Sequence, residues 1–553
     1  MEESTNLNQQ ISNRIDFNLI KQGSVVVVGS ENIANYLCAY LCGLGIGEIH
    51  LFNQDLVTAK SSSSEFLIAQ SESYYERKID KIENIVKQIN KDVNITTFFS
   101  EFDSAFLDES SATDQTIIID TTNNPLSKYN CYSQAKQISQ ISKQEVHLIS
   151  ASSNLDCASI SKLLITQSQK KHSRNKLERL VQNTQNKKYV DKNMDNLLLE
   201  EYFGKKQGSY TSCVISALVA DEIRKIVNPL FVESNKELLG RIDFSIYSDK
   251  LFKYSAHKSN QSIKSIKLNQ SNQKMINLLN KKNKTEKKIH KKLKNNKLRK
   301  NKFKNNKFKN SKIKNKKILV VGVGGIGTYV ALNCALFGYG QIDIYDGDIE
   351  EDHNLNRQIL FYNSIGLNKA DSIKQKLQKI NSFTQINSYP TYFGKNELIR
   401  GKKYDLIFSC VDNWSARKLI SEYSVKTKTP LINGSVTTFD CELDFFIPGK
   451  TLCHNCYNPY SEFIESEIEN NGSEESASCA DRPVNVVMPN AFVGGLMSGI
   501  GELVSTRNYK SLSAIINKKI NYRSQKKDQY KFGFEKEERL CTSNCDCDCH
   551  KFA

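Results

Sequence analysis

Side chains of the kinds that handle a nucleoside triphosphate stand close together in the C-terminal half of the chain. In chain order they are Asp346, Asp348, Asn354, Arg357, Lys369 and Asp412. Arginine and lysine can hold phosphates, and a carboxylate can hold Mg²⁺ opposite a departing pyrophosphate. Hydride transfer to a nicotinamide has no use for this group of cations and carboxylates. The residue types therefore favour transfer chemistry on ATP over a dehydrogenase.

A glycine-rich turn precedes these side chains. Residues 318–321 form a short apolar, β-branched run that predicts a buried parallel strand. The glycines after it are Gly322, Gly324, Gly325 and Gly327. In GxGxxG spacing they let the backbone approach a phosphate, and the helix that should begin here offers free N–H groups to an anion. A second predicted strand, 341–345, leads to Asp346, where a carboxylate can take a ribose hydroxyl. Alone, this turn would suit a dinucleotide as readily as ATP.

Together, the turn and the polar residues resemble the ThiF/MoeB-type adenylyltransferases, a family that includes the activating enzymes of ubiquitin-like proteins. The resemblance covers about residues 312–553 and rests on DGD, NLNRQ, IGLNKA and VDN standing in the family's order. It implies an ATP site formed by the four glycines with Asp346 on ribose, Asp348 beside it, Asn354, Arg357 and Lys369 on phosphates, and Asp412 on Mg²⁺. The implied reaction is adenylation, in which a carboxylate attacks the α-phosphate.

Composition places the chain among soluble proteins. Its 553 residues suffice for two or three domains. No apolar run approaches the roughly 20 residues that span a bilayer, and the polar start MEESTNLNQQ resembles neither a signal nor a transit peptide. Fifteen scattered cysteines fit a reducing compartment. We therefore expect a cytoplasmic protein without membrane contact.

The N-terminal half resembles a degenerate copy of the C-terminal half. Val25–Val28 and Gly29 lie 293 residues before their counterparts 318–322, and the segment 45–55 lies at the same offset from 338–348. Further along the chain, residues 116–123 sit opposite 406–413. The constant spacing of the first two matched strands predicts an α/β protein with two Rossmann-like, doubly wound domains: a degenerate one over 1–254 and an active one over 317–553.

The first copy has lost its polar residues. Asn53 stands where the second copy has Asp346, Thr122 is aligned with Asp412, and bulkier residues replace three of the glycines. We therefore expect a catalytically silent half that pairs with the active half as an intramolecular pseudo-dimer. Eukaryotic activators of ubiquitin-like proteins resemble this arrangement. Arg14 is a weak candidate for an arginine supplied by the silent half, and an unrelated Rossmann-like domain with its own ligand is the alternative.

Most of the positive charge lies between the copies. The net charge is +17, yet residues 281–317 alone hold 19 Lys or Arg and one acidic residue, which leaves about −1 for the rest of the chain. The Lys- and Asn-rich segment 255–316 cannot form a core and is expected to be a disordered linker. Interleaved Phe303 and Phe308 could stack on RNA bases while lysines hold phosphates, but a solvated tether is the favoured interpretation.

Two cysteine groups predict a structural Zn²⁺ site. Cys453 and Cys456 form a CxxC, and four more cysteines end the chain in CTSNCDCDCH. Zinc is usually held by four thiolates from two close pairs, and in the resembling family two such pairs at these places bind it. We assign Cys545 and Cys549 as the second pair, with Cys547 or His550 as substitutes.

Cys479 is a candidate nucleophile. It follows an acidic loop and precedes a helix predicted to begin near Asn490, in a Cys-Ala setting that resembles the thioester cysteine of some compact activators. Arg482 and the helix start could lower its pKa. Plain adenylators of the family often carry a cysteine here without using it, so both roles stay open.

The predicted function is ATP- and Mg²⁺-dependent adenylation of the C-terminal carboxylate of a small ubiquitin-like or sulfur-carrier protein. The predicted catalytic residues are Arg357, Lys369, Asp412 and Cys479. The sequence PGKTLCHNC also resembles the family branch that adenylates ribosomally made precursor peptides, which is the nearest alternative. An RNA-directed protein and an NAD-dependent oxidoreductase are the remaining classes.

Overall fold

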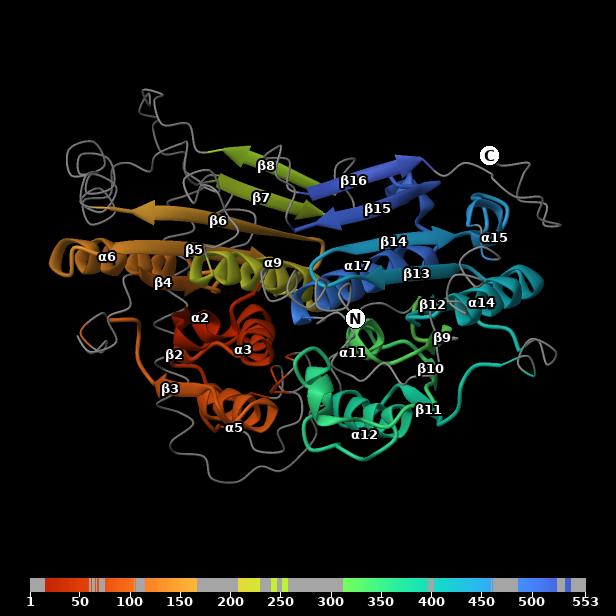
Figure 1. The fold of residues 1–553 in the computed structure, drawn as a ribbon, viewed down its shortest axis with the longest axis horizontal. Helices are drawn as coiled ribbons and strands as arrows, with labels where there is room; N and C mark the ends of the chain where they lie inside the picture. The colour runs from red at the N-terminus through yellow and green to blue at the C-terminus, as the bar shows by residue number, and fades with distance from the viewer. Residues whose placement is uncertain are drawn as a thin grey trace, which may run out of the picture. The chain divides into compact units, whose positions relative to one another are not determined.

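The computed structural model forms two large mixed sheets flanked by helices (Figure 1). It describes residues 15–58, 75–103, 115–166, 207–228, 240–245, 251–256, 312–394, 402–458, 486–524 and 533–538, with the single positions or pairs 61, 65, 67–68, 105, 396 and 460. Arg14, most of the predicted linker, Cys479 and the C-terminal cysteines lie outside these residues.

The first sheet is built from the N-terminal half. Its described strands are β1 (Ser24–Val28), β2 (Glu48–Phe52), β3 (Asn94–Phe98), β4 (Gln115–Asp120), β5 (Glu145–Ser153), β6 (Cys157–Ile165), β7 (Gly240–Ser245) and β8 (Phe252–Ala256). Their order is β3-β2-β1-β4-β5-β6-β7-β8, parallel as far as β5 and antiparallel beyond it. Its helices are α2 (Phe17–Gln22), α3 (Asn32–Leu44), α5 (Lys78–Ile89), α6 (Pro125–Ile141) and α9 (Ser209–Val227).

The second sheet repeats this topology in the C-terminal half. Its described strands are β9 (Lys317–Val321), β10 (Gln341–Tyr345), β11 (Gln385–Tyr389), β12 (Leu406–Ser409), β13 (Leu431–Val436), β14 (Cys441–Phe446), β15 (Lys518–Arg523) and β16 (Gly533–Glu538), in the order β11-β10-β9-β12-β13-β14-β15-β16. Its helices are α11 (Gly325–Phe337), α12 (Lys369–Ile380), α14 (Trp414–Thr427), α15 (His454–Tyr457) and α17 (Val487–Ser505), with short 3₁₀ turns η5 (Asp352–Asn354), η6 (Ile359–Phe361) and η7 (Tyr509–Leu512). The predicted pair of Rossmann-like domains is confirmed.

Local sequence explains where these elements begin and end. The central strands are β-branched and buried on both faces, as parallel strands between helical layers must be. Helices α3 and α11 end at Gly45 and Gly338, whose φ values of 82° and 83° suit glycine. Asn368 and Asn413 begin α12 and α14 by accepting hydrogen bonds from backbone N–H groups in the first turn.

The strand register corrects one correspondence drawn from the sequence. Val28 pairs with Asp120 and Val321 pairs with Ser409, so Asp120 and Ser409 are equivalent positions. Counting on from these pairs places Asn123, and not Thr122, opposite Asp412. The sequence alignment paired 116–123 with 406–413, an offset of 290, whereas the register gives 409 − 120 = 289, so the alignment was off by one residue.

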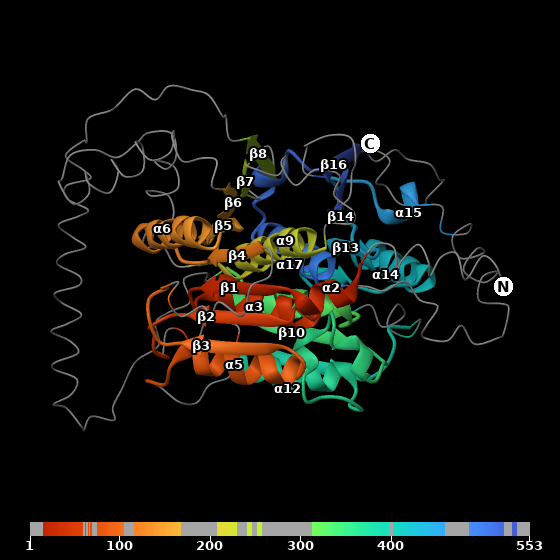
Figure 2. The same cartoon turned by 60° about the vertical axis from the view of Figure 1, so that its left-hand side comes forward.

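The two halves pack through their helices (Figure 2). Buried apolar residues of both halves form one hydrophobic cluster. Helices α9 and α17 lie side by side, and α3 contacts α17. Buried charge also joins the halves. Asp221 of α9 accepts hydrogen bonds from the hydroxyls of Tyr522 (3.0 Å) and Ser524 (2.8 Å), and the guanidinium of Arg224 donates to Ser524 (3.2 Å).

Within the described residues, α17 is the helix with the length and apolar composition of a membrane span. It packs against the sheet and against α9 and α11 and is 94% buried over its most apolar stretch. It is a core helix of this fold.

Candidate active site

The predicted nucleotide residues meet at the carboxyl ends of β9, β10 and β12. In the strand order, β9 and β12 are neighbours although two strands separate them in the chain, so the connections from them run to opposite sides. Crevices at such switch points are where open α/β sheets bind ligands. The turn after β9, the Asp346 segment after β10 and Asp412 after β12 all stand at this edge.

The glycine turn leaves the start of α11 open. Gly322 has φ +81°, and a Cβ on it would lie 2.9 Å from the carbonyl oxygen of Cys410. A Cβ on Gly327 would lie 1.9 Å from the carbonyl oxygen of Gly322, so the helix requires glycine there too. A Cβ on Gly324 would meet only the Gln358 amide, at 3.8 Å, whereas a Cβ on Gly325 would lie 2.2 Å from the side-chain oxygen of Asn490. Among the described residues, no side chain is hydrogen-bonded to the N–H groups of the first turn of α11, so these groups can bind a phosphate.

Asp346 is fixed by the backbone around it. One carboxylate oxygen accepts a hydrogen bond from the N–H of Val323 (2.7 Å) and the other accepts one from the N–H of Asp348 (2.9 Å). Burial raises the pKa of this carboxyl, which the two backbone donors partly oppose. Each carboxylate oxygen can accept more than one hydrogen bond, so ribose hydroxyls can still bind.

Lys369 and Asp348 form the second part of the site. Lys369 is the first residue of α12, and its Nζ lies 3.2 Å from Oδ2 of Asp348. The other carboxylate oxygen of Asp348 accepts a hydrogen bond from the Tyr392 hydroxyl at 2.7 Å. Tyr392 also covers Gly347, because a Cβ there would lie 2.9 Å from its ring. The lysine side chain is buried, whereas the aspartate side chain is half exposed.

Asn354 and Arg357 stand in the segment that follows. A guanidinium nitrogen of Arg357 donates to Oδ1 of Asn354 at 3.0 Å, and another donates to the side-chain oxygen of Asn356 at 2.9 Å. Asn354 is buried and Arg357 is half-buried. The structure thus brings together two of the three residues predicted to contact phosphates.

Asp412 is exposed at the end of β12, just before the Asn413 cap of α14. No hydrogen bond or ion pair engages its carboxylate among the residues that the structure describes. The pKa of Tyr392 is raised, first by its hydrogen bond to Asp348 and also by the charges of Asp346 and Asp412. The three aspartates therefore face one region, and Asp412 offers free oxygen ligands of the kind Mg²⁺ prefers.

Sequence reasoning missed three residues of this site. Tyr392 closes over Asp348 as described above. Arg417 is fully enclosed on α14 and donates to the carbonyl oxygens of Val411 and Gly434, which fixes the backbone next to Asp412. Glu350 is 1% exposed, and neither of its carboxylate oxygens has a hydrogen-bond partner among the described residues. The spacing DN-x₃-R could have identified Arg417 from the sequence. Glu350 could not be identified in this way, because its acidic run IEED is typical of a solvent-exposed surface.

Glu350 should make stability depend on pH. Burial raises its pKa to about 8, and Lys369 and Arg357 only partly oppose this. Between about pH 5 and 8 the unfolded chain gives up this proton while the folded chain keeps it, so stability falls as pH rises through that window. The free energy of unfolding of Glu350→Gln should therefore exceed that of the wild type at pH 8.5 by on the order of 3 kcal/mol. The two values should be equal near pH 4.5. Urea unfolding across pH measures it.

The exposed neighbour Glu351 supplies the control for this titration. Glu351→Gln should change stability little at either pH, since its side chain is 62% exposed. A pH-independent difference between Glu350→Gln and the wild type would show that Glu350 is already ionised in the folded protein at neutral pH.

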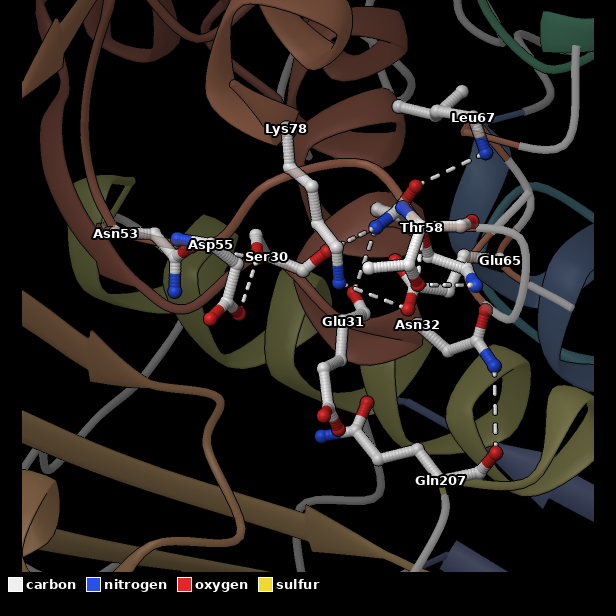
Figure 3. Close-up of polar contacts among 12 residues, drawn as sticks. Ser30, Glu31, Asn32, Asn53, Asp55, Thr58, Glu65, Leu67, Lys78 and Gln207 are labelled. Carbon is white, nitrogen blue, oxygen red and sulfur yellow. Dashed lines mark hydrogen bonds and ion pairs between the residues drawn. The ribbon is translucent and has the colours of Figure 1, made fainter. Parts of the chain in front are cut away.

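The equivalent region of the N-terminal half is blocked at its helix start (Figure 3). The N–H of Ile33, in the first turn of α3, donates to the side-chain oxygen of Gln207 at 2.8 Å. The amide nitrogen of Gln207 donates to the carbonyl oxygen of Thr121 at 2.8 Å. Gln207 thus occupies the backbone donor that a phosphate would use, and Glu31 adds a carboxylate at the helix start.

One basic residue survives in the blocked half. The N–H of Lys78 donates to the carbonyl oxygen of Asp55 at 3.1 Å, just as the N–H of Lys369 donates to that of Asp348 at 2.9 Å. Its Nζ, however, is paired with buried Glu65 at 3.0 Å (Figure 3). Asp55 and Asn53 are held by the Ser30 hydroxyl. The retained lysine was not recognised from sequence, and it is neutralised inside the protein.

The cysteine predictions are only partly within the described residues. Cys453 and Cys456 are buried at the start of α15, with their sulfur atoms 3.5 Å apart. Tetrahedral Zn²⁺ with bonds of about 2.3 Å requires sulfurs about 3.8 Å apart, so this pair fits half of a zinc site. No group of three or more potential ligands occurs in the described part of the chain. The second pair, Cys545 and Cys549, lies outside it.

Comparison with known proteins decides the family. A model of the ThiF family matches residues 5–275 and 292–549, and so covers both halves. The chain belongs to the ThiF family. The resemblance seen in the C-terminal half thus extends to the N-terminal copy, and both sheets are ThiF-family folds.

Individual relatives match a smaller part. The adenylyltransferase and sulfurtransferase UBA4 of Debaryomyces hansenii is 34% identical over 145 residues, which are 26% of this chain and 32% of that protein. The adenylyltransferase and sulfurtransferase MOCS3 of Culex quinquefasciatus is 35% identical over 144 residues, which are 26% of this chain and 33% of that protein. The chain therefore spans about a third of the length of these relatives.

Among solved structures, E. coli MccB with ATP is similar at 23% identity and a TM-score of 0.37, over 44% of this chain and 69% of that one. E. coli MccB with MccA is similar at 26% identity and a TM-score of 0.36, over 43% of this chain and 68% of that one.

Proposed function

We propose that this ThiF-family chain uses ATP to adenylate the C-terminal carboxylate of a small ubiquitin-like or sulfur-carrier protein. The observation that carries the proposal is the contrast between the halves. In the second half the described residues place no side-chain hydrogen bond on the first turn of α11, which lies beside Asp346, Lys369 and Asp412, whereas in the first half Gln207 bonds an N–H group in the first turn of α3. The relatives that are named adenylyltransferases support the same reaction class.

The residues of the site suit attack on an α-phosphate. Ribose hydroxyls bind the Asp346 carboxylate, and the triphosphate lies against the start of α11. Lys369 and Arg357 stabilise the negative charge that grows on the phosphate oxygens as the carboxylate adds and pyrophosphate leaves. Asp412 and its neighbours would hold Mg²⁺, which neutralises pyrophosphate when bound. The side chains thus position the reactants and balance charge, and no side chain needs to act as a base.

The N-terminal half serves as a scaffold in this proposal. Its start of α3 is occupied and its lysine is paired, so a second nucleotide has no equivalent place to bind. The shared cluster and the buried contacts of Asp221 join it to the active half as an intramolecular pseudo-dimer.

ATP–pyrophosphate exchange tests the function. We expect exchange with Mg²⁺ only when a protein substrate with a free diglycine carboxyl end is present, and none when that end is amidated. Exchange supported by a short precursor peptide would move the substrate assignment to peptides. No exchange with either, alongside binding of RNA or NAD, would contradict adenylation.

A Zn²⁺ ion is proposed to join Cys453 and Cys456 to the C-terminal cysteines. We expect about one zinc per chain by mass spectrometry of the metal, and its loss in Cys456→Ser with a decrease in stability of several kcal/mol. Cys441→Ser, which changes a buried thiol on β14 outside the CxxC, should retain the metal. Full zinc content in Cys456→Ser would contradict the assignment.

Transfer of the acyl group to Cys479 remains a proposal based on the sequence alone. Cys479→Ser should leave exchange intact and remove any conjugate that is sensitive to thiols. A conjugate that survives this change would place the acceptor elsewhere.

A further inference from the structure

The silent half touches the active site through helix α3. Gly43 lies near the end of this helix, and a Cβ on it would be 2.9 Å from the carbonyl oxygen of Asn356 and 3.2 Å from a methyl carbon of Ile359. Asn356 and Ile359 flank Arg357, and α3 packs on the turn η6 that begins at Ile359. A glycine inside a helix is less stabilising than alanine. The close approach to the Arg357 segment gives a physical reason for this glycine.

We propose that Gly43 is a positioning residue for Arg357, so that the N-terminal half shapes the phosphate site of the C-terminal half. The proposal rests on the adenylation function. It assigns the silent half a specific task, which is to set the backbone from which the Arg357 side chain extends.

The backbone of Arg357 is also held by Tyr329, a residue of its own half that packs against α3. The Tyr329 hydroxyl donates a hydrogen bond to the carbonyl oxygen of Arg357 at 2.8 Å. The Tyr329 ring packs edge-on against the ring of Tyr40 in α3, with centroids 5.7 Å apart and planes at 86°. Both tyrosines are fully buried. The backbone of Arg357 is therefore fixed by α3 directly at Gly43 and indirectly through Tyr40 and Tyr329.

A third contact holds the far end of the same segment. The side-chain nitrogen of Asn363 donates to the side-chain oxygen of Gln88, from α5 of the silent half, at 2.6 Å. The guanidinium of Arg357 donates hydrogen bonds within its own segment, to Asn354, to Asn356 and to the carbonyl oxygen of His353. A shift of the segment would therefore carry the charged group with it.

The glycine belongs to one copy only. Helices α3 and α11 correspond at an offset of 293 residues, which places Leu336 opposite Gly43. The small residue is thus found in the half that faces the Arg357 segment, and it is not a common requirement of this helix. Misplacement of a catalytic group by about 1 Å can lower a rate by about 100-fold. A side chain at residue 43 should therefore lower the rate of adenylation.

Two substitutions of graded size test the proposal. We expect Gly43→Ala to lower kcat/KM for ATP in the exchange reaction by about tenfold and Gly43→Val by about 100-fold, while the melting temperature of Gly43→Ala stays within about 4 °C of the wild type because alanine favours the helix. Gly495→Ala is the matched control. Gly495 is a helical glycine of α17 that faces α9 of the silent half, where a Cβ would lie 2.8 Å from Val214. It should keep exchange within about twofold.

A double-mutant cycle separates positioning from general damage. If Gly43 acts through Arg357, Gly43→Ala should have at most a twofold effect in an Arg357→Ala background. A tenfold loss in both backgrounds would overturn the proposal.

Hydrogen exchange of residues 354–361 provides a readout that does not depend on activity. Gly43→Val should increase deuterium uptake in this segment several-fold, and Gly495→Ala should not. Unchanged uptake in Gly43→Val would overturn the positioning role even if the chain adenylates its substrate. If deuterium uptake increased in a chain that catalyses no ATP–pyrophosphate exchange, the positioning role would stand and adenylation would be rejected.

Discussion

Asp412→Ala is expected to lower ATP–pyrophosphate exchange by at least about 1,000-fold. The reason lies in how the three aspartates are engaged. Asp346 accepts two backbone hydrogen bonds, and Asp348 is held by Lys369 and Tyr392. Asp412 is exposed, and its carboxylate has no hydrogen bond among the described residues, so it is the group best able to hold Mg²⁺ against pyrophosphate. Initial rates of radiolabelled pyrophosphate incorporation at saturating ATP measure the loss.

The equivalent position in the silent half provides the control. The register places Asn123 opposite Asp412, and its side chain bonds both the N–H and the carbonyl oxygen of Ser153. Asn123→Ala should therefore reduce stability by about 1–2 kcal/mol and keep exchange within a few-fold. Substantial exchange by Asp412→Ala would show that the metal is held elsewhere.

Much of the fold was predictable because the parallel strands have a distinctive sequence pattern. Runs such as Val25–Val28 and Ile318–Val321 have no polar residue and are each followed by glycine, which leaves few alternatives to a buried strand. The constant offset between the copies then gave the second domain. Gly322 and Asp346 could be picked out because each directly follows a predicted strand, and Lys369 because it stands in the IGLNKA motif of the resembling family.

What could not be predicted depended on changes in spacing and on long-range contacts. Lys78 follows Asp55 by 23 residues, whereas Lys369 follows Asp348 by 21, so the constant offset concealed their equivalence. Gln207 closes α3 from a position 174 residues away from Ile33, and no local pattern signals this. Burial at Glu350 likewise depends on how its segment packs, because its neighbours in sequence are charged.

Substitutions of Lys369 and Lys78 test directly whether the C-terminal half carries the nucleotide chemistry and the N-terminal half is a scaffold. Lys369→Ala should lower kcat/KM for ATP by about 100- to 1,000-fold, since it removes a cation from the developing phosphate charge without exposing a buried partner. Its partner Asp348 is half exposed and can be solvated, so stability should change by less than about 1 kcal/mol.

Lys78→Ala should give the opposite pattern. Its partner Glu65 is buried, and its carboxyl already has a pKa raised to about 7 by burial, with Lys78 opposing that shift. Removing the lysine leaves this carboxyl without its counter-charge, at a cost of about 3–5 kcal/mol in unfolding free energy, while exchange measured well below the melting temperature should persist. Lys78→Ala combined with Glu65→Gln should recover most of the stability. If Lys78→Ala instead lost exchange as Lys369→Ala does, with the double variant stable yet inactive, the N-terminal half would be contributing charge to the nucleotide chemistry.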